Sequence, residues 1–307
     1  MKLLNFGSMN IDYVYKVDHF VQKGETLSSE DLNVFSGGKG LNQSIALSRA
    51  GERVYHAGAI GYEGGFLLEV LKQADVDTGY VTVHEGVQTG HAMIQNDREG
   101  DNCIILYGGA NQRIDRTQID RVLSGFGAGD FVILQNEISE LDYIIRQAHE
   151  LGMTIALNPS PMDQKIPELP LDLVDYFLVN EVEAAALAGT AEAGGNDEDV
   201  LARLAEKFPG ARIVMTLGSD GSVYWDGRQA YRQEAIKAEA VDTTAAGDTY
   251  TGYFISGILR GDAIADILYQ ASVASAIAVT RPGAAPSIPE RHEVDEVVRN
   301  KKKGDNI

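Results

Sequence analysis

The sequence has almost no cysteine, a deficit of basic residues and no long uninterrupted apolar run, and each absence excludes a class of protein. Cys103 is the single cysteine among 307 residues, so no internal disulfide can form, which fits a reducing compartment. Lysine and arginine together number 26, against 45 aspartates and glutamates. The net charge of -19 argues against nonspecific binding to nucleic acid or to an anionic membrane, although a local site can still accept an anionic substrate.

The apolar segments do not predict export or insertion into a membrane. The most apolar long segment, residues 262–280, is interrupted by Asp266 and Gln270, and we interpret it as a buried helix. Residues 1–12 lack the long apolar core of a signal peptide. We therefore expect a cytoplasmic protein that binds neither membranes nor nucleic acid.

Short apolar segments alternate with amphipathic helical segments from about residue 53 onward. This alternation is typical of parallel βαβ units, in which ligands bind at the carboxyl ends of the strands. The predicted strands are 53–60, 130–135, 153–158, 176–180 and 212–218. The predicted helices between and around them include 65–74, 140–151 and 198–208.

Two regions interrupt this alternation. Residues 10–35 and 88–107 contain segments of alternating polar and apolar residues with no helical segment between them. Such segments suit a small antiparallel sheet. We therefore expect one α/β domain over residues 1–307, with a lid formed by these two insertions.

The stretch VDTTAAGDTYTGYF, residues 241–254, contains the best candidate for chemistry. A helix that begins near Ala246 would place its free backbone N–H groups beside Asp248 and residues too small to block a ligand. Asp248 could simply be a first-turn acid that interacts with the helix dipole. It could instead be a general base, beside N–H groups of Ala245, Ala246 and Gly247 that stabilise a transferring phosphoryl group.

A second glycine-rich stretch, FSGGKGLNQS at 35–44, precedes an amphipathic helix. Glycines allow a ligand to approach the backbone, and a helix start favours anions or hydroxyl-rich ligands. A tight turn with a surface lysine explains the same residues, and a glycine cluster alone favours that simpler interpretation. The stretch is not a Walker loop, because Lys39 is followed by Gly40.

Polar side chains follow several predicted strands directly. Glu137 follows the strand that ends near residue 135, the segment NPSP follows the strand that ends at 158, and Asn180 and Glu183 lie at the next strand-to-helix junction. Each alone has an ordinary role as a cap or turn. Together they predict a ligand site at one edge of the sheet.

These motifs make the chain similar to the ribokinase family of ATP-dependent sugar kinases, also called the PfkB carbohydrate kinases. The similarity extends from GSMNID (7–12) to GAAPSIP (283–289), and GGKGLNQS and VDTTAAGDTYTG are its strongest motifs. The segments GETL, GGAN, NPSP, NEVE and TRPGAAPS add to it. The resemblance implies a three-layer α/β/α domain with a mainly parallel central sheet and a small antiparallel β-sheet lid.

The resemblance also implies roles for individual residues. Asp248 would be the catalytic base, with an anion hole formed by Ala245, Ala246 and Gly247. The residues implied to bind the sugar are Asn10, Asp12, Gly38, Lys39, Asn42 and Glu137, together with Asp248. Those implied to border the nucleotide are Asn180, Thr216, Gly218 and Gly221. Glu183 would hold Mg²⁺ through water, and the loops implied to hold K⁺ contain Asp242, Thr244, Ala278, Arg281, Gly283 and Ser287.

The activity implied by the resemblance is transfer of the γ-phosphate of ATP to the primary (5-) hydroxyl of D-ribose. Two alternatives stay open: a sibling kinase for fructose, a keto-deoxy sugar acid or a nucleoside, and a non-catalytic sugar-binding protein on the same scaffold. The resemblance further implies Mg²⁺ and K⁺ as cofactors and a homodimer formed through the lid.

Overall fold

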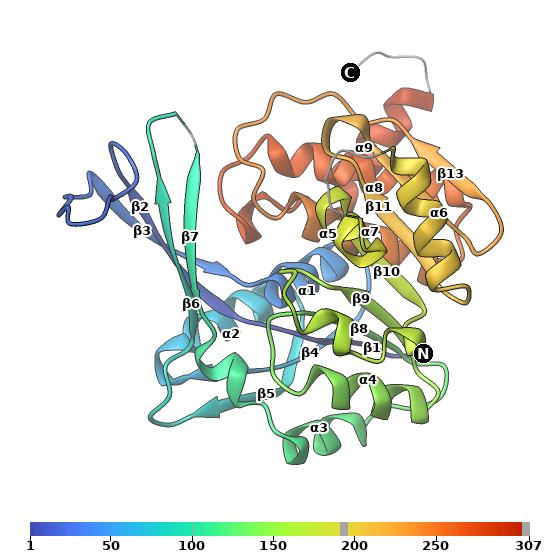
Figure 1. The fold of residues 1–307 in the computed structure, drawn as a ribbon, viewed down its shortest axis with the longest axis horizontal. Helices are drawn as coiled ribbons and strands as arrows, with labels where there is room; N and C mark the ends of the chain where they lie inside the picture. The colour runs from blue at the N-terminus through green and yellow to red at the C-terminus, as the bar shows by residue number, and fades with distance from the viewer. Residues whose placement is uncertain (100, 191–195, 303–307) are drawn as a thin grey trace.

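A central sheet crosses the molecule (Figure 1). The computed structural model describes residues 1–99, 101–190 and 196–302. Within these residues the sheet has nine strands, in the order β13-β12-β11-β10-β9-β8-β1-β4-β5. Residue 100 of the second predicted insertion, and residues 191–195 and 303–307 of the predicted domain, lie outside the described residues. The strands from β5 to β11 are parallel, and β12 and β13 complete the edge as antiparallel strands. The strand bounds are β1 Leu3–Phe6, β4 Val54–Gly61, β5 Asp77–His84, β8 Phe131–Gln135, β9 Thr154–Asn158, β10 Tyr176–Asn180, β11 Arg212–Thr216, β12 Ser222–Trp225 and β13 Ala230–Gln233.

The strand order reverses beside β1. The chain passes from β1 to β4 on one side, and β8 later pairs with the other side of β1, so that Leu4 is in register with both Tyr55 and Val132. Every residue of β8 is buried, as its continuous apolar run predicts for a central parallel strand. A crevice at the carboxyl ends of β1 and β8 is the expected ligand position in such a sheet.

Helices cover both faces of the sheet, so the predicted three-layer α/β/α fold is confirmed (Figure 1). On one face α3 to α6 contribute to a single apolar cluster; Leu141, Ile144, Ile145 and Ala148 form the buried stripe of α4. On the other face α1, α2, α7, α8 and α9 contribute to a second cluster. The helix bounds are α1 Lys39–Arg49, α2 Gly65–Gln73, α3 Arg116–Leu123, α4 Leu141–Glu150, α5 Glu181–Ala188, α6 Asp197–Lys207, α7 Ala246–Arg260, α8 Ile264–Val279 and α9 Arg291–Lys302. Short 3₁₀ turns are η1 Tyr62–Gly64, η2 Gly109–Arg113, η3 Ile166–Glu168, η4 Leu171–Leu173, η5 Gly218–Asp220 and η6 Ala285–Ser287.

A small second sheet stands beside the main body (Figure 1), and the described residues give it the order β3-β2-β6-β7. Its bounds are β2 Asn10–Lys16, β3 Asp31–Gly37, β6 Gly90–Asn96 and β7 Asn102–Tyr107. The outer pairs are antiparallel, while the central pair of β2 and β6 is parallel. This parallel pair joins segments that are far apart in the sequence, so no hairpin turn sets its direction.

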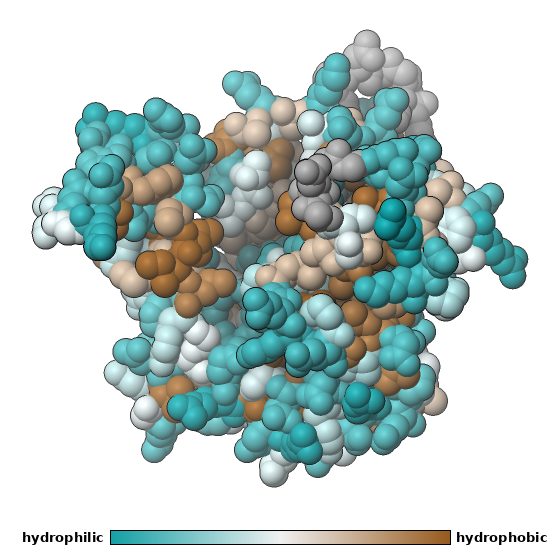
Figure 2. All heavy atoms as spheres, in the orientation of Figure 1, coloured by the Kyte–Doolittle hydropathy of each residue, from teal (hydrophilic) through white to brown (hydrophobic). Residues whose placement is uncertain are grey.

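Apolar side chains gather on the small sheet, next to a hollow between it and the main body (Figure 2). All residues of β7 are exposed, and Ile105 is 61% exposed. The most apolar predicted helix is observed as the largely buried α8. Across the described ranges, no helix is long and apolar enough to cross a membrane.

Candidate active site

Asp248 lies in the first turn of α7, the helix that begins at Ala246 as its small-residue sequence predicts. The side chain is only 7% exposed. Ala245 caps the helix with a left-handed backbone, φ 60° and ψ 9°, a strained conformation for a residue with a Cβ. The space beside Gly247 is open, since a Cβ built there would meet no atom within 4 Å. The helix N-terminus can therefore be approached by a ligand.

The predicted anion donors differ in their availability. The N–H of Ala246 donates to the carbonyl oxygen of Thr243 (3.2 Å), so this group already has a partner within the loop. Gly247 and Asp248 follow at positions where a helix leaves backbone N–H groups without intrahelical partners. A negative charge near Gly247 would meet both these donors and the positive end of the helix dipole.

Two consecutive amides of α1 hold the carboxylate of Asp248. Asn42 Nδ2 donates to Oδ2 (3.2 Å), and Gln43 Nε2 donates to Oδ1 (2.9 Å). Each carboxylate oxygen therefore keeps one lone pair for another donor. In the described part of the chain, Asn42 Oδ1 is buried without a hydrogen-bond partner.

The glycine-rich stretch before α1 is needed for close packing. Gly38 has φ 93°, in the left-handed region that favours glycine. A Cβ on Gly40 would lie 2.4 Å from the backbone nitrogen of Ser8, so the start of α1 touches the segment that links β1 to β2. The simpler interpretation of these glycines, a tight turn, describes Gly38, while Gly40 brings the helix start against the end of β1.

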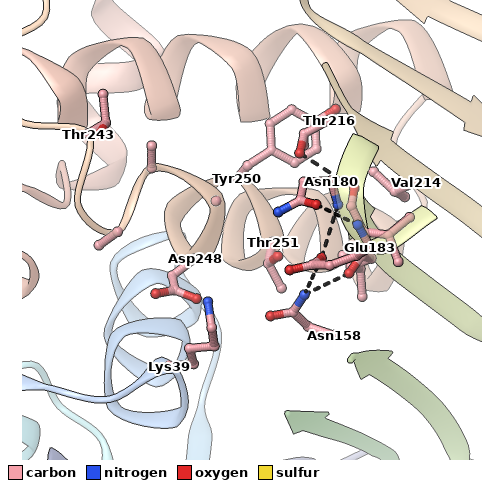
Figure 3. A pocket seen from close by; sticks show the side chains of 15 residues that line it. Lys39, Asn158, Asn180, Glu183, Val214, Thr216, Thr243, Asp248, Tyr250 and Thr251 are labelled. Atoms are coloured by element: carbon pink, nitrogen blue, oxygen red, sulfur yellow. Dashed lines mark hydrogen bonds between the residues drawn. The ribbon is translucent and has the colours of Figure 1, made fainter. Parts of the chain in front are cut away.

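Lys39 connects the two halves of the site. Its backbone N–H donates to Glu137 Oε2 (2.9 Å), the oxygen that also accepts the hydroxyl of Ser8. Its ammonium points toward the Asp248 carboxylate (Figure 3). Burial alone would lower the pKa of Lys39, but the negative charges of Asp248, Glu137 and Glu183 outweigh it and raise that pKa. The lysine is therefore a fixed positive charge between three carboxylates.

The residues predicted for the sugar lie on the side of the small sheet. Burial raises the pKa of Asp12 to about 7, and the nearby Glu137 carboxylate adds to the increase. Burial also raises the pKa of Glu137, against the hydrogen bond from Ser8 and the charge of Lys39. Asn10 is buried and accepts a hydrogen bond from Asn111 Nδ2 (2.8 Å). Its amide oxygen thus already has a protein partner.

The residues predicted for the nucleotide and Mg²⁺ meet on the other side of Asp248. A cavity of about 240 Å³ is lined by Lys39, Asn180, Glu183, Thr216 and the segment 245–248 (Figure 3). A larger pocket of about 1010 Å³ shares part of this lining and adds Gly218 and Gly221. The two cavities meet at the start of α7.

Glu183 has a structural role as well as a place in the cavity. Asn180 caps α5 by accepting from the N–H of Glu183 (2.8 Å), and Glu183 Oε2 accepts from the N–H of Asn180 (3.0 Å). This capping box fixes the carboxylate at the cavity wall. No group of three or more His, Cys, Asp or Glu side chains that could hold a metal occurs in the described residues. One carboxylate supplemented by water and phosphate oxygens still suits Mg²⁺.

The loops predicted to hold K⁺ are joined by Asp242. Its Oδ1 accepts from the N–H of Thr244 (2.8 Å), and its Oδ2 accepts from the N–H of Gly283 (2.9 Å). Burial alone would raise the pKa of Asp242, but a hydrogen bond from the Thr244 side chain, together with those from the N–H groups of Thr244 and Gly283, outweighs it and lowers that pKa. The structure thus brings Asp242, Thr244 and Gly283 together.

The other residues predicted for K⁺ have different surroundings. Arg281 pairs with Glu293 (2.6 Å), and Ser287 is buried with its hydroxyl donating to the carbonyl oxygen of Ala284 (2.8 Å). Ala278 is buried near the end of α8, and its carbonyl oxygen accepts from the N–H of Arg281 (3.1 Å). Oxygen atoms of backbone and side chains are thus present in these loops, but Arg281 directs its charge to Glu293.

The site also contains polar residues that the sequence reasoning did not assign to it. Gln43 contacts Asp248, Ser8 contacts Glu137, and Asn158 accepts from Gln43 Nε2 (3.3 Å). Asn158 is the first residue of the NPSP motif, which the sequence pattern locates at a strand end without indicating a role for each residue. In the sequence, Gln43 is indicated as a site residue by its position next to Asn42, on a helix that otherwise faces the core.

Residues 1–291 of the chain match a family model described as the pfkB family carbohydrate kinase. The chain belongs to this family and is a carbohydrate kinase. It is 35% identical over 304 residues to the ribokinase of Staphylococcus aureus (strain COL), which covers 96% of this chain and 99% of that protein. It is also 35% identical over 312 residues to the ribokinase of Schizosaccharomyces pombe, with 96% and 97% covered.

Solved structures agree with the sequence relatives. The Arabidopsis thaliana ribokinase complexed with ribose and ATP superposes with a TM-score of 0.86 at 29% identity, covering 97% of this chain and 98% of that one. The Cryptococcus neoformans ribokinase in complex with ADP also has a TM-score of 0.86, at 32% identity, with 96% and 99% covered. The resemblance indicated by the motifs is therefore confirmed, and the similarity to these ribokinases covers 96–97% of this chain.

Proposed function

We propose that the protein is an ATP-dependent sugar kinase that transfers the γ-phosphate of ATP to the 5-hydroxyl of D-ribose. The observation that carries this proposal is the position of Asp248: nearly buried, held by two amides, and placed at the helix start where the two cavities meet. The similarity to ribokinases, one of them solved with ribose and ATP, supports ribose as the sugar.

In the proposed reaction Asp248 accepts the proton of the 5-hydroxyl as its oxygen attacks the γ-phosphorus. The bond from the γ-phosphorus to the β-phosphate oxygen breaks, and ADP leaves with that electron pair. Backbone N–H groups at the start of α7, with Gly247 leaving them open, stabilise the charge on the transferring group. Lys39 lies close to Asp248, so its positive charge would add to this stabilisation of the transferring group.

The sugar would bind between the small sheet and α1. Asn42 Oδ1, which has no partner in the described chain, and the carboxyl of Asp12 suit sugar hydroxyls as acceptors. Glu137 would keep its second oxygen for the sugar, because both Ser8 and the N–H of Lys39 use Oε2. The remaining proposed sugar-binding residues are Asn10, Gly38 and Lys39.

The nucleotide would occupy the larger pocket, which is lined by Thr216, Gly218 and Gly221. Asn180 would border it from the adjoining smaller cavity. We propose that Glu183 holds Mg²⁺ through water, where the metal would neutralise charge on the phosphates. We also propose that K⁺ binds the loops joined by Asp242, where it would add positive charge beside the start of α7. We propose a single domain over residues 1–307, a cytoplasmic location, and a homodimer through the small sheet acting as a lid.

A panel of sugars and nucleosides with ATP, Mg²⁺ and K⁺, measured by release of ADP, tests the substrate. Ribose should give the highest kcat/KM, with ribose 5-phosphate as product. Turnover of fructose, a sugar acid or a nucleoside in its place would retain the kinase and replace the substrate. Absence of turnover with every acceptor, alongside binding of a sugar, would favour the non-catalytic alternative.

Asp248→Asn tests the mechanism. Loss of a general base should lower kcat by about 10²–10⁴-fold, while sugar binding measured by calorimetry stays within a few-fold. Glu69→Gln, in α2 and paired with Lys72, is a matched loss of a carboxylate outside the two cavities and should leave kcat unchanged. A kcat of Asp248→Asn equal to that of the unmodified protein would refute the assignment.

A further inference from the structure

A chain of buried amide side chains links Asp248 to the central sheet. Gln43 Oε1 accepts from Gln135 Nε2 at the end of β8 (2.7 Å), and the same Nε2 donates to Asn5 Oδ1 in β1 (3.0 Å). Gln43, Gln135 and Asn5 are all 0% exposed. Three fully buried amides in a row are costly to desolvate unless their hydrogen bonds are made.

Groups that can only accept hydrogen bonds fix the direction of every amide in this chain. At one end the Asp248 carboxylate requires Gln43 to present its NH₂, so Gln43 Oε1 must face Gln135. At the other end Asn5 Nδ2 donates to the carbonyl oxygen of Gly40 (2.8 Å), so Asn5 Oδ1 must face Gln135. Gln135 therefore donates to both neighbours, and no amide can turn over without breaking a hydrogen bond.

A branch of the same network leads to the cavity wall. Gln43 Nε2 also donates to Asn158 Oδ1 (3.3 Å), and Asn158 Nδ2 donates to the carbonyl oxygen of Leu178 (2.8 Å). Asn158 Nδ2 further lies 3.5 Å from Glu183 Oε2. Gln43 is thus tied to β8, to β9 and to α7 at once.

We propose that Gln43 is a positioning residue, which acts through Asp248 by holding its carboxylate in the orientation that meets the sugar hydroxyl. This inference rests on the proposed function, because it assigns Asp248 as the base. Asn42 and Gln43 donate hydrogen bonds to different oxygens of the same carboxylate. Together these bonds restrict both the position of the carboxylate and the rotation of its plane. The chain to Gln135 and Asn5 in turn anchors Gln43 to two central strands.

The proposed positioning role of Gln43 differs from the role of a residue that binds the sugar directly. Gln43 is 0% exposed, and both hydrogens of its NH₂ already have protein acceptors. A group that only orients the base should affect the chemical step and leave the affinity for the sugar unchanged. A group that contacted the sugar would change KM as well.

The test is a double-mutant cycle between Gln43→Met and Asp248→Asn, with methionine chosen for its similar length. Gln43→Met should lower kcat by roughly 10–100-fold and change KM for the sugar by less than about 3-fold. In the Asp248→Asn background, Gln43→Met should lower kcat by less than about 2-fold more, because the base it positions is gone. Gln147→Met, the same change on helix α4, is the control and should leave kcat unchanged.

Other outcomes overturn the inference. An equal fall in kcat with and without Asp248 would mean that Gln43 supports the fold in general, and a rise in KM alone would mean that it contacts the sugar. If Asp248→Asn retains full turnover, the assignment of Asp248 as the base fails instead, and the Asp248→Asn single variant of the cycle reveals this.

Two further variants keep the inference testable if Gln43→Met does not fold. Gln43→Glu preserves an acceptor for Gln135 but places a second carboxyl group against Asp248, where the two groups would repel each other or share a proton, so it should lower kcat at least as much. Gln135→Met leaves Gln43 in place but removes its anchor, and it should lower kcat by about 3–10-fold with an unchanged KM. Full kcat in both folded variants would refute the positioning role.

Discussion

Asp248 and Asp242 flank the same short loop, but their surroundings differ at the level of single atoms. Asp248 accepts from two side-chain amides and faces a cavity. Asp242 accepts from two backbone N–H groups that belong to different loops. The first arrangement orients a carboxylate toward a ligand, whereas the second uses a carboxylate to join two chain segments.

Asp12 gives the protein a pH-dependent stability. Its pKa rises from 3.8 to about 7 on folding, so between these values the folded state holds a proton that the unfolded chain has released. Stability should therefore be full below about pH 4 for this group and fall as pH rises toward 7. Asp12→Asn cannot ionise and should remove this fall.

Urea unfolding of both proteins at pH 5, 6, 7 and 8 measures the effect. The difference in free energy of unfolding should change in favour of Asp12→Asn by at most about 1.4 kcal/mol per pH unit up to pH 7, and then level off. Parallel curves for the two proteins across this range would contradict the raised pKa.

At the scale of elements, the start of α1 depends on a glycine that permits close approach. A Cβ on Gly40 would lie 2.4 Å from Ser8 N and 2.5 Å from the carbonyl carbon of Gly7. Gly40→Ala must therefore displace α1 from the end of β1, at a cost of about 1–3 kcal/mol in the free energy of unfolding. Because α1 carries Asn42 and Gln43, kcat should fall as well.

A second helical glycine provides the matched control for Gly40→Ala. Gly65 begins α2 with φ -54°, and a Cβ there would meet no atom within 4 Å. Gly65→Ala should leave kcat unchanged and stabilise the protein by up to about 1 kcal/mol, because alanine favours the helix. Equal stability and equal kcat for both variants in urea unfolding and activity assays would exclude the packing argument.

The two loops joined by Asp242 form the second element that we expect to matter for activity. Under the proposed K⁺ site, replacing tetramethylammonium by K⁺ should raise kcat severalfold in the unmodified protein. Asp242→Asn replaces one acceptor oxygen by a donor and loses a charge, so the loops should separate and the response to K⁺ should disappear. Thermal unfolding with each cation checks the binding without activity, and equal midpoints in both cations would count against the site.

Across the whole molecule, the main layers followed from the sequence because local patterns determine them. The apolar run of β8 and the buried stripe of α4 predict their own burial whatever the distant contacts are. The pairing of strands that are far apart in the sequence was harder to predict. The parallel pairing of β2 with β6 joins two distant insertions, and no turn between them indicates its direction. The direction of a pair depends on the assembled fold.

The candidate site divides in the same way. Asp248 could be predicted because a helix start, small residues and a carboxylate are adjacent in sequence. Its link to Gln43, Gln135 and Asn5 could not, since each amide comes from a different element and its partner depends on how those elements meet. For Asn5 and Gln135 the local indication was a polar residue inside an otherwise apolar strand, as in LLNF and FVILQ.

The exposed apolar surface of the small sheet leads to a prediction about assembly. β7 is an edge strand in which Ile104, Ile105, Leu106 and Tyr107 are between 49% and 61% exposed. Figure 2 shows apolar side chains gathered on the small sheet. An exposed apolar surface on an open sheet edge favours pairing with another chain. In the proposed homodimer this other chain is a second copy of the protein. Ile105 is in register with Met93, which pairs with Tyr13, so it lies on the face opposite Asp12.

Ile105→Asp should therefore weaken dimerisation by about 2–4 kcal/mol, roughly 30–1000-fold, because a carboxylate would replace an apolar contact in the interface. Light scattering coupled to gel filtration at micromolar protein should give the mass of a dimer for the unmodified protein and of a monomer for the variant. Tyr62→Asp, at a site that is 74% exposed in η1 and outside the small sheet, should stay dimeric. A monomeric unmodified protein, or a variant that stays dimeric at all concentrations, would exclude the small sheet as the interface.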